Sequence, residues 1–164
     1  MSSTLQKSAL AFSRHNHQHC EKTLLNVART LCAKREVRLT RRRQQVLEVL
    51  LSTHQPMGAY EVLSTLNRRE QNITPPIVYR ALDFLQQQGL VHRIESRNAF
   101  IPCMHPGHAS EAQFLICSGC ERVAELQNAG LNITSEAREL GFEVSHAVIE
   151  VSGLCADCRK LRCP

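Results

Sequence analysis

The spacing of apolar residues predicts four helices in the first half of the chain, after a polar N-terminal stretch. Between residues 21 and 32, apolar side chains recur at the three- and four-residue intervals of an amphipathic helix. A second predicted helix starts after Thr40, a residue type that caps helix N-termini, and ends near His54. A third covers about residues 59–69 and places its valine and leucine side chains on one face.

The fourth predicted helix has the clearest ends. Thr74 can cap it, Pro75 suits its first turn, and Gly89 allows the left-handed conformation that stops a helix. Four apolar residues spaced i, i+3, i+4 and i+7 form one face of this helix, which leaves Tyr79 and Arg80 on the other. The four are Val78, Ala81, Leu82 and Leu85.

Two short strands follow, in LVHRIESRNAFIPC, around a turn at residues 96–98. Three short helices followed by a hairpin is the element order of a winged helix. The rest of the chain predicts strands at residues 113–117, 123–126 and 143–151 and a helix at 133–140. The fold class is therefore α+β: a winged-helix DNA-binding domain followed by a small α/β dimerisation and metal-binding domain. The predicted boundaries are a flexible tail at 1–20, the winged helix with its hinge at 21–103, and the second domain at 104–164.

Charge is divided unevenly along the 164-residue chain, whose net charge is +5. Residues 1–96 carry 14 Lys and Arg against 7 Asp and Glu, whereas residues 97–164 carry 6 against 8. The first part is therefore predicted to bind a polyanion. Because no apolar segment is long enough for a secretory signal or a membrane span, we expect a cytoplasmic protein without a membrane partner.

Six of the eight cysteines lie in the second part, and four of them form two C-x-x-C pairs. Thiols stay reduced in the cytoplasm, so metal binding is favoured over a disulfide framework. Each C-x-x-C turn, or knuckle, offers two thiolates to one ion, and two knuckles complete a tetrahedral site that selects zinc. A redox dithiol is the less favoured alternative, because no thioredoxin-like βαβ pattern is present. The predicted structural zinc ligands are Cys117, Cys120, Cys155 and Cys158.

A second set of candidate ligands lies around the boundary between the predicted domains. His92 lies in the hairpin, Cys103 at its end, His105 and His108 in the connecting loop, and Glu125 after the first knuckle. Singly, each is more often an ordinary surface or core residue. A mixed set of sulfur, nitrogen and oxygen ligands binds zinc more weakly than four thiolates do. Together these residues predict a site that fills and empties as zinc varies.

The outward face of the fourth predicted helix is typical of a recognition helix, whose N-terminal residues reach base edges. Arg80 is the predicted base reader, beside Tyr79. Arg41 and Arg42 are predicted phosphate contacts, although the start of a solvated helix explains them as well. Tyr60 is predicted to contact a phosphate or a base, with an ordinary half-buried aromatic as the alternative.

Three segments of the chain resemble the ferric uptake regulator family, and within it the zinc uptake regulator branch. They are PPIVYRALDFLQQQGLVH, FLICSGCERVAEL and VIEVSGLCADC, and the resemblance extends over about residues 22–160. It implies a winged helix, a dimerisation domain, and repression of metal-uptake genes by a metal-loaded homodimer on operator DNA. It also implies that the knuckle cysteines bind a structural zinc, and that His92, Cys103 and Glu125 bind a regulatory one. Two zinc ions per protomer are expected.

The fourth ligand of the regulatory zinc departs from the family pattern. The resemblance implies a histidine just ahead of the first knuckle, where this chain has Ser110. Either His105 or His108 replaces it, and His108 is the predicted ligand. His146 matches a position that binds metal in some relatives, and it is predicted to be structural because its companion ligands are not evident.

The predicted function is a zinc-responsive repressor that binds double-stranded operator DNA and represses zinc-uptake genes. An iron, manganese or peroxide sensor of the same family is one alternative, but the thiolate of Cys103 favours zinc over harder ions. A zinc-stapled module without a sensing role is another. Neither an enzyme nor a small organic substrate is expected. H-E-x-x-H does not occur, and no H-x-E is paired with a following P-C-x-x-C.

Overall fold

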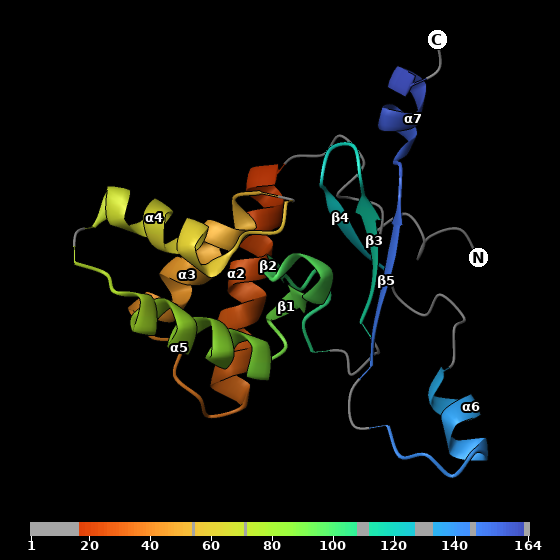
Figure 1. The fold of residues 1–164 in the computed structure, drawn as a ribbon. Coiled ribbons are helices and arrows are strands. Elements are labelled where there is room, and N and C mark those ends of the chain that lie inside the picture. Colours follow the sequence, from red (N-terminus) through yellow and green to blue (C-terminus); the bar gives the residue numbers. More distant parts are fainter. Residues whose placement is uncertain are drawn as a thin grey trace. The chain divides into compact units, whose positions relative to one another are not determined.

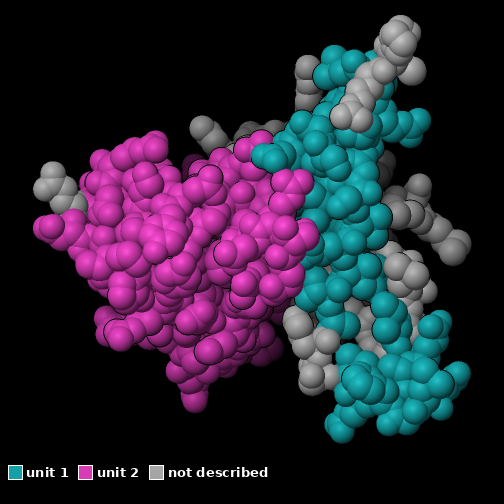
Figure 2. All heavy atoms as spheres, in the orientation of Figure 1, with its two compact units in different colours: residues 1–13, 109–164 teal, residues 14–108 magenta. Residues whose placement is uncertain are grey.

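The structure is a computed structural model that describes residues 17–53, 55–70, 72–107, 112–126, 133–144 and 147–162. The chain divides into two compact units (Figure 2). The helical unit is described from residue 17 to residue 107, and the sheet unit from residue 112 to residue 162. Among these residues, no helix combines the length and apolar character that crossing a membrane requires.

Four helices build the helical unit (Figure 1): α2 (His17–Lys34), α3 (Arg41–Leu51), α4 (Ala59–Arg69) and α5 (Pro75–Gln87). Their apolar faces form one core, because residues three and four positions apart share a side of a helix. Side chains that are fully buried in this core include Val49, Leu50, Val62, Val78 and Leu82.

α2 begins at His17, earlier than the predicted start at Glu21, so the last residues of the predicted tail are helical. Once a helix has nucleated, each further residue adds a backbone hydrogen bond, and polar residues can therefore extend it. Cys20, in this extension, is half-buried and packs against the core.

The ends of α3 are fixed by two hydroxyl groups. The Thr40 hydroxyl accepts a hydrogen bond from the N–H of Arg43 at 3.5 Å, which confirms the predicted cap. The helix ends at Leu51, before the predicted end. The Ser52 hydroxyl donates to the carbonyl of Val49 at 2.7 Å and so satisfies an acceptor of the last turn.

Both ends of α5 fall where the sequence predicts. Thr74 is the extended N-cap residue and Pro75 follows in the first turn, although within the described residues the Thr74 side chain makes no capping hydrogen bond. Gly89 has a left-handed backbone with φ of +63°. The N–H of Leu90 then donates to the carbonyl of Leu85 at 2.9 Å, as in the Schellman end that glycine permits.

The predicted hairpin follows α5 directly. β1 (Val91–Ile94) and β2 (Ala99–Pro102) are antiparallel and are joined by a 3-10 turn at Glu95–Arg97. A two-way backbone bridge between Met57 and Phe100 ties the hairpin to the α3–α4 connection. The helices and hairpin therefore have the predicted winged-helix order.

The sheet unit contains β3 (Ala112–Cys117), β4 (Val123–Leu126), β5 (Val148–Gly153), α6 (Ile133–Glu139) and α7 (Ala156–Arg162). The strand order is β4-β3-β5, with β3 antiparallel to β4 and parallel to β5 (Figure 1). The parallel strands β3 and β5 are separated in sequence by β4 and α6, and α6 lies in the connection from β4 to β5. The predicted α+β class is confirmed.

Two elements of the sheet unit differ from the prediction. β5 begins at Val148 instead of residue 143, because its parallel partner β3 begins at Ala112, which lies opposite Val148. Sequence periodicity does not predict α7, which is a short helix of 7 residues. Asp157 in its first turn is a signal for a helix N-terminus.

Candidate metal centre and nucleic-acid surface

The four knuckle cysteines converge at one end of the sheet. Cys117 is the last residue of β3 and lies opposite Gly153, the last residue of β5. The first knuckle leaves β3 at Cys117, and the second begins at Cys155, just beyond β5. Parallel pairing therefore brings the two knuckles together. The Sγ atoms of Cys117, Cys120, Cys155 and Cys158 all lie within 4.8 Å of one another.

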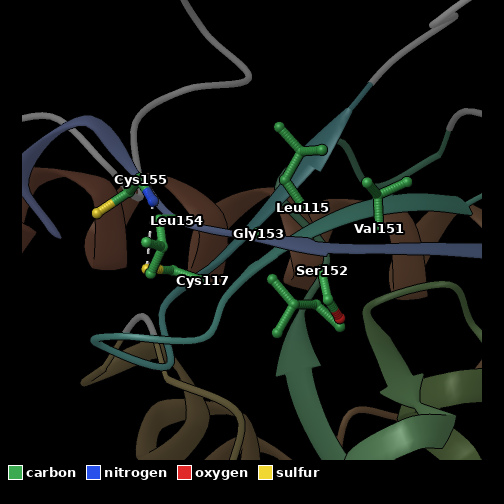
Figure 3. Close-up of a pocket in the computed structure, with 8 residues that line it drawn as sticks. Leu115, Cys117, Val151, Ser152, Gly153, Leu154 and Cys155 are labelled. Carbon is green, nitrogen blue, oxygen red and sulfur yellow. Dashed lines mark hydrogen bonds between the residues drawn. The ribbon is translucent and has the colours of Figure 1, made fainter. Parts of the chain in front are cut away.

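Backbone N–H groups point at the cluster from both knuckles. The N–H of Gly119 donates to Cys117 Sγ at 3.4 Å, and the N–H of Cys155 donates to the same sulfur at 3.3 Å (dashed in Figure 3). The sulfurs of Cys120 and Cys155 are 3.8 Å apart, so the two knuckles are in direct contact. These donors favour the thiolate form, which is the form that binds metal.

Arg122 lies against the same cluster. Its Nε donates to Cys120 Sγ at 3.2 Å, and its guanidinium reaches Cys155 Sγ at 4.0 Å. An ion pair of 3.6 Å joins it to Asp157 in α7. A single cation therefore contacts a sulfur of each knuckle.

Hydrogen bonds separate the pKa values of the thiols. Burial raises the pKa of Cys117, but three backbone N–H groups, that of Cys155 foremost, outweigh it and lower the pKa to about 6. Burial also opposes the lowering of the Cys120 pKa, which follows mainly from donation by Arg122. The pKa of Cys158 is raised to about 12, first by its hydrogen bond with Cys155 and then by burial. Metal binding requires thiolates, so it would release the proton that Cys158 retains.

The cluster fits a zinc ion by two observations. Sulfurs that bind one tetrahedral zinc at about 2.3 Å lie roughly 3.8 Å apart, which is close to the Cys120–Cys155 separation. In addition, a Cβ built on Gly119 would lie 2.9 Å from Cys158 Sγ, so only glycine lets the first knuckle approach the second this closely. The residues present therefore suit a closed four-sulfur site.

An apolar hollow lies beside two of the thiols, where β3 and β5 end (Figure 3). Leu115, Val151 and Leu154 line it with carbon side chains, next to Cys117 and Cys155. Two of the predicted ligands therefore border an apolar hollow.

The second predicted ligand set draws on both units. In the helical unit, His92 lies in β1 and Cys103 follows β2, where its N–H donates to the carbonyl of Leu90 at 2.9 Å. In the sheet unit, Glu125 lies in β4 opposite Phe114. Cys103 and Glu125 are buried, and His92 is half-buried. Joint binding of a metal by these residues stays a prediction.

The remaining candidates for this second site fall in the connecting loop. His105 is half-buried in the helical unit, whereas His108 and Ser110 lie outside the described residues. His146 also lies outside them. The choice of His108 as fourth ligand is therefore untested.

The predicted recognition face is exposed. Val78 and Leu82 of α5 are fully buried, while Tyr79 on the other face is 43% exposed and its neighbour Arg80 is exposed. Tyr60, at the start of α4, is 67% exposed. Exposed arginine and tyrosine side chains can donate to base edges and phosphates.

The two predicted phosphate-binding arginines of α3 have different surroundings. The Arg41 side chain is 80% exposed and lies 3.5 Å from a carboxylate oxygen of Glu70. Arg42 donates to the other Glu70 oxygen and, at 3.0 Å, to the side-chain oxygen of Gln45. Arg41 is therefore open to a phosphate, whereas Arg42 is held within the helical unit.

Three residues make contacts that the sequence does not predict, and one of them, Arg43, is expected from the sequence only to attract phosphates as part of a run of basic residues. The Arg43 guanidinium lies 3.4 Å from the centre of the Phe84 ring, so it fastens α3 to α5 and is not simply one of a run of surface cations. Gly119 and Arg122 lie against the cysteine cluster. The glycine inside the C-S-G-C sequence of the first knuckle was the available signal for close approach.

Comparison of the sequence with known proteins gives matches over most of the chain. The model of the ferric uptake regulator family matches residues 34–152. The chain is 42% identical over 140 residues to the zinc uptake regulation protein of Escherichia coli (strain K12), covering 82% of this chain and 81% of that protein. It is 29% identical over 131 residues to the peroxide operon regulator of Bacillus subtilis (strain 168), covering 76% and 86%.

Solved structures give the same result for the fold. A zinc uptake regulator complexed with zinc and DNA matches with a TM-score of 0.81 at 38% identity, over 86% of this chain and 96% of that one. The crystal structure of holo XcZur matches with a TM-score of 0.77 at 38% identity, over 84% and 98%.

Proposed function

This chain belongs to the ferric uptake regulator family, and we propose that it is a zinc-responsive transcriptional repressor. In this proposal it binds operator DNA as a zinc-loaded homodimer and represses zinc-uptake genes. The observation that carries the proposal is its likeness, over most of the chain, to a zinc uptake regulator solved with zinc and DNA. The identity to a zinc regulator also exceeds that to a peroxide regulator, which supports zinc over the other sensors considered.

Cys117, Cys120, Cys155 and Cys158 would hold the structural zinc. Their convergence within 4.8 Å and the close approach at Gly119 support this assignment. A zinc ion bound there supplies a cross-link between the end of β3 and the start of α7, and such links in small domains contribute directly to folding.

His92, Cys103, His108 and Glu125 would hold a regulatory zinc, which gives two zinc ions per protomer. The resemblance to the family and the mixed ligand set support this second site. A thiolate, an imidazole and a carboxylate together suit zinc and release it more readily than four thiolates do. Occupancy of this site would then follow the zinc level.

Arg80 and Tyr79 would read bases from the exposed face of α5, and Arg41 and Tyr60 would bind phosphates or nearby base edges. Their exposure supports this assignment. Arg42, which the sequence also suggests, would contribute less because Glu70 and Gln45 already hold its guanidinium. The remaining cations supply sequence-independent attraction.

Operator affinity measured at buffered zinc concentrations, together with metal content per protomer, tests this function. We expect two zinc ions per protomer and operator binding that strengthens as the weaker site fills. A single tightly bound zinc ion, with no zinc-dependent change in operator affinity, would indicate that zinc only stabilises the fold and that the protein does not sense zinc.

Two variants separate sensing from structure. Cys103→Ser should keep the fold, the dimer and one zinc per protomer, yet lose most of the zinc-dependent strengthening of operator binding. Cys120→Ser should lose the sheet unit or the dimer, because structural zinc is worth on the order of 10 kcal/mol in small domains. If Cys103→Ser still bound the operator only in zinc, with the same midpoint, the regulatory ligand set would be wrong.

A further inference from the structure

Arg122 is placed where a four-thiolate zinc site needs a positive charge, and we propose that it is a functional part of that site. Its guanidinium would hydrogen-bond to the bound thiolates of both knuckles and so hold zinc in place. This inference rests on the proposed structural zinc at the knuckle cysteines. It assigns to Arg122 a positioning role, distinct from direct ligation.

Charge is the first argument. Four thiolates around one Zn²⁺ carry a net charge of −2, and they lie in the acidic part of the chain, where residues 97–164 carry 8 acidic against 6 basic side chains. Removing such a cluster from water without a counter-charge is unfavourable. Arg122 contacts Cys120 Sγ at 3.2 Å, within hydrogen-bonding range for sulfur.

Geometry is the second argument. The planar guanidinium offers several donors in a fixed arrangement, and it reaches Cys155 Sγ at 4.0 Å in addition to Cys120. Arg122 thus spans two knuckles that are far apart in the sequence. A lysine ammonium at this position could supply the charge but not two separated donors.

Local structure fixes the arginine in this position. The first knuckle is closed by two backbone bonds, from Glu121 N–H to Cys117 O at 2.9 Å and from Cys117 N–H to Arg122 O at 3.0 Å. The backbone of Arg122 is therefore part of the knuckle, and its side chain is only 29% exposed. The Asp157 carboxylate, at the start of α7, lies 3.6 Å from Nη2, the same guanidinium nitrogen that faces Cys155 Sγ. These contacts hold the guanidinium beside the thiols of both knuckles.

The test uses the full-length protein in a Cys103→Ser background, so that a single zinc is measured. Arg122→Ala is compared with Arg159→Ala, which removes an exposed arginine of α7 in the same unit. Zinc affinity is measured by competition with a chromophoric chelator. We expect Arg122→Ala to bind zinc about 10- to 100-fold more weakly, the range typical of residues that support metal ligands, and Arg159→Ala to match the background protein.

A cobalt-substituted sample adds a readout that a merely structural role would not change. A hydrogen bond stabilises the lone pairs of a thiolate, so losing the bond from Arg122 should move the thiolate-to-cobalt charge-transfer absorption to longer wavelength. In zinc affinity and in the cobalt absorption, Arg122→Lys should lie between Arg122→Ala and the background protein. If Arg122→Ala does not fold, the comparison of Arg122→Lys with the background protein tests the proposal.

Zinc affinity and cobalt spectra that are the same in Arg122→Ala and Arg159→Ala would overturn the proposal. An Arg122→Lys protein with the same zinc affinity and cobalt spectrum as the background protein would also overturn it, because lysine cannot contact both sulfurs as the guanidinium does. A background protein that holds no zinc at all would instead refute the proposed structural site, so the two failures are distinguishable.

Discussion

Asn67 and Ile73 exchange two hydrogen bonds across the turn between α4 and α5. The side-chain amide of Asn67 donates to the carbonyl of Ile73 at 3.0 Å, and the N–H of Ile73 donates to the side-chain oxygen of Asn67 at 3.0 Å. Asn72, inside this turn, has a left-handed backbone with φ of +71°. The end of α4 is thus fastened to the residue that leads into α5, the proposed recognition helix.

Asn67→Ala should therefore loosen the presentation of α5. Ile73 is buried, and leaving its backbone groups unpaired should lower the free energy of unfolding by about 1–3 kcal/mol. Operator affinity should fall more than affinity for random DNA, because base contacts depend on helix orientation. Denaturant unfolding and fluorescence anisotropy measure the two effects. Gln86→Ala on the exposed side of α5 is the control, and equal losses on both DNAs would argue against an orienting role.

Arg80→Ala should reduce discrimination between bases. An arginine that donates to a guanine edge contributes about 1–3 kcal/mol of discrimination, so the variant should bind the operator and a base-substituted operator with similar affinity. Anisotropy titrations with both duplexes at one salt concentration measure this ratio. Gln87→Ala, which also changes an exposed residue of α5, should leave the ratio unchanged. A ratio that survives in Arg80→Ala would place base recognition elsewhere.

Gly119→Ala should disturb the metal site by steric contact alone. The new methyl group would lie 2.9 Å from Cys158 Sγ and 3.0 Å from Cys158 Cβ, so one knuckle must shift. Overpacking of this kind typically costs about 1–3 kcal/mol, and here the cost should appear as weaker zinc retention. Chelator competition and thermal unfolding measure it, with Ser118→Ala on the same knuckle as the control. Unchanged zinc retention would show that the knuckles have room to separate.

Glu70 makes the stability of the helical unit depend on acidity. Hydrogen bonds from Gln45 and then Arg42 lower the pKa of Glu70 below its ordinary value of 4.5. The ionised carboxylate therefore stabilises the folded state above that value, and this contribution disappears as the pH falls below it. The difference in free energy of unfolding between the wild type and Glu70→Gln should shrink on acidification. Thermal unfolding across this range measures it, and Glu36→Gln, at an exposed position, should show no such trend.

The predictable parts of the structure are those that local chemistry determines. Thr40, Pro75 and Gly89 act on neighbouring backbone groups, so the ends of α3 and α5 can be read from the sequence. The knuckle cysteines can likewise be identified as candidate zinc ligands from the sequence, because the C-x-x-C spacing is itself a local pattern.

The parts that could not be predicted depend on partners distant in the sequence. Arg42 and Glu70 are 28 positions apart, and nothing in either neighbourhood indicates that they meet. The start of β5 is set by the start of β3, and the contact of Arg122 with Cys155 follows from that same strand pairing. Side-chain type alone could not tell this arginine from an ordinary surface cation.

The parallel pairing of β3 with β5 also orders events during synthesis. The first knuckle begins at Cys117 and the second at Cys155, 38 positions later, so the thiols of the first knuckle emerge from the ribosome before their partners exist. The helical unit ends at residue 108, ahead of the first knuckle, so it is by then free to fold. In the proposed site all four thiols bind one zinc ion, so capture waits until Cys158 has emerged. Metal insertion at the proposed site would therefore follow the synthesis and folding of the helical unit.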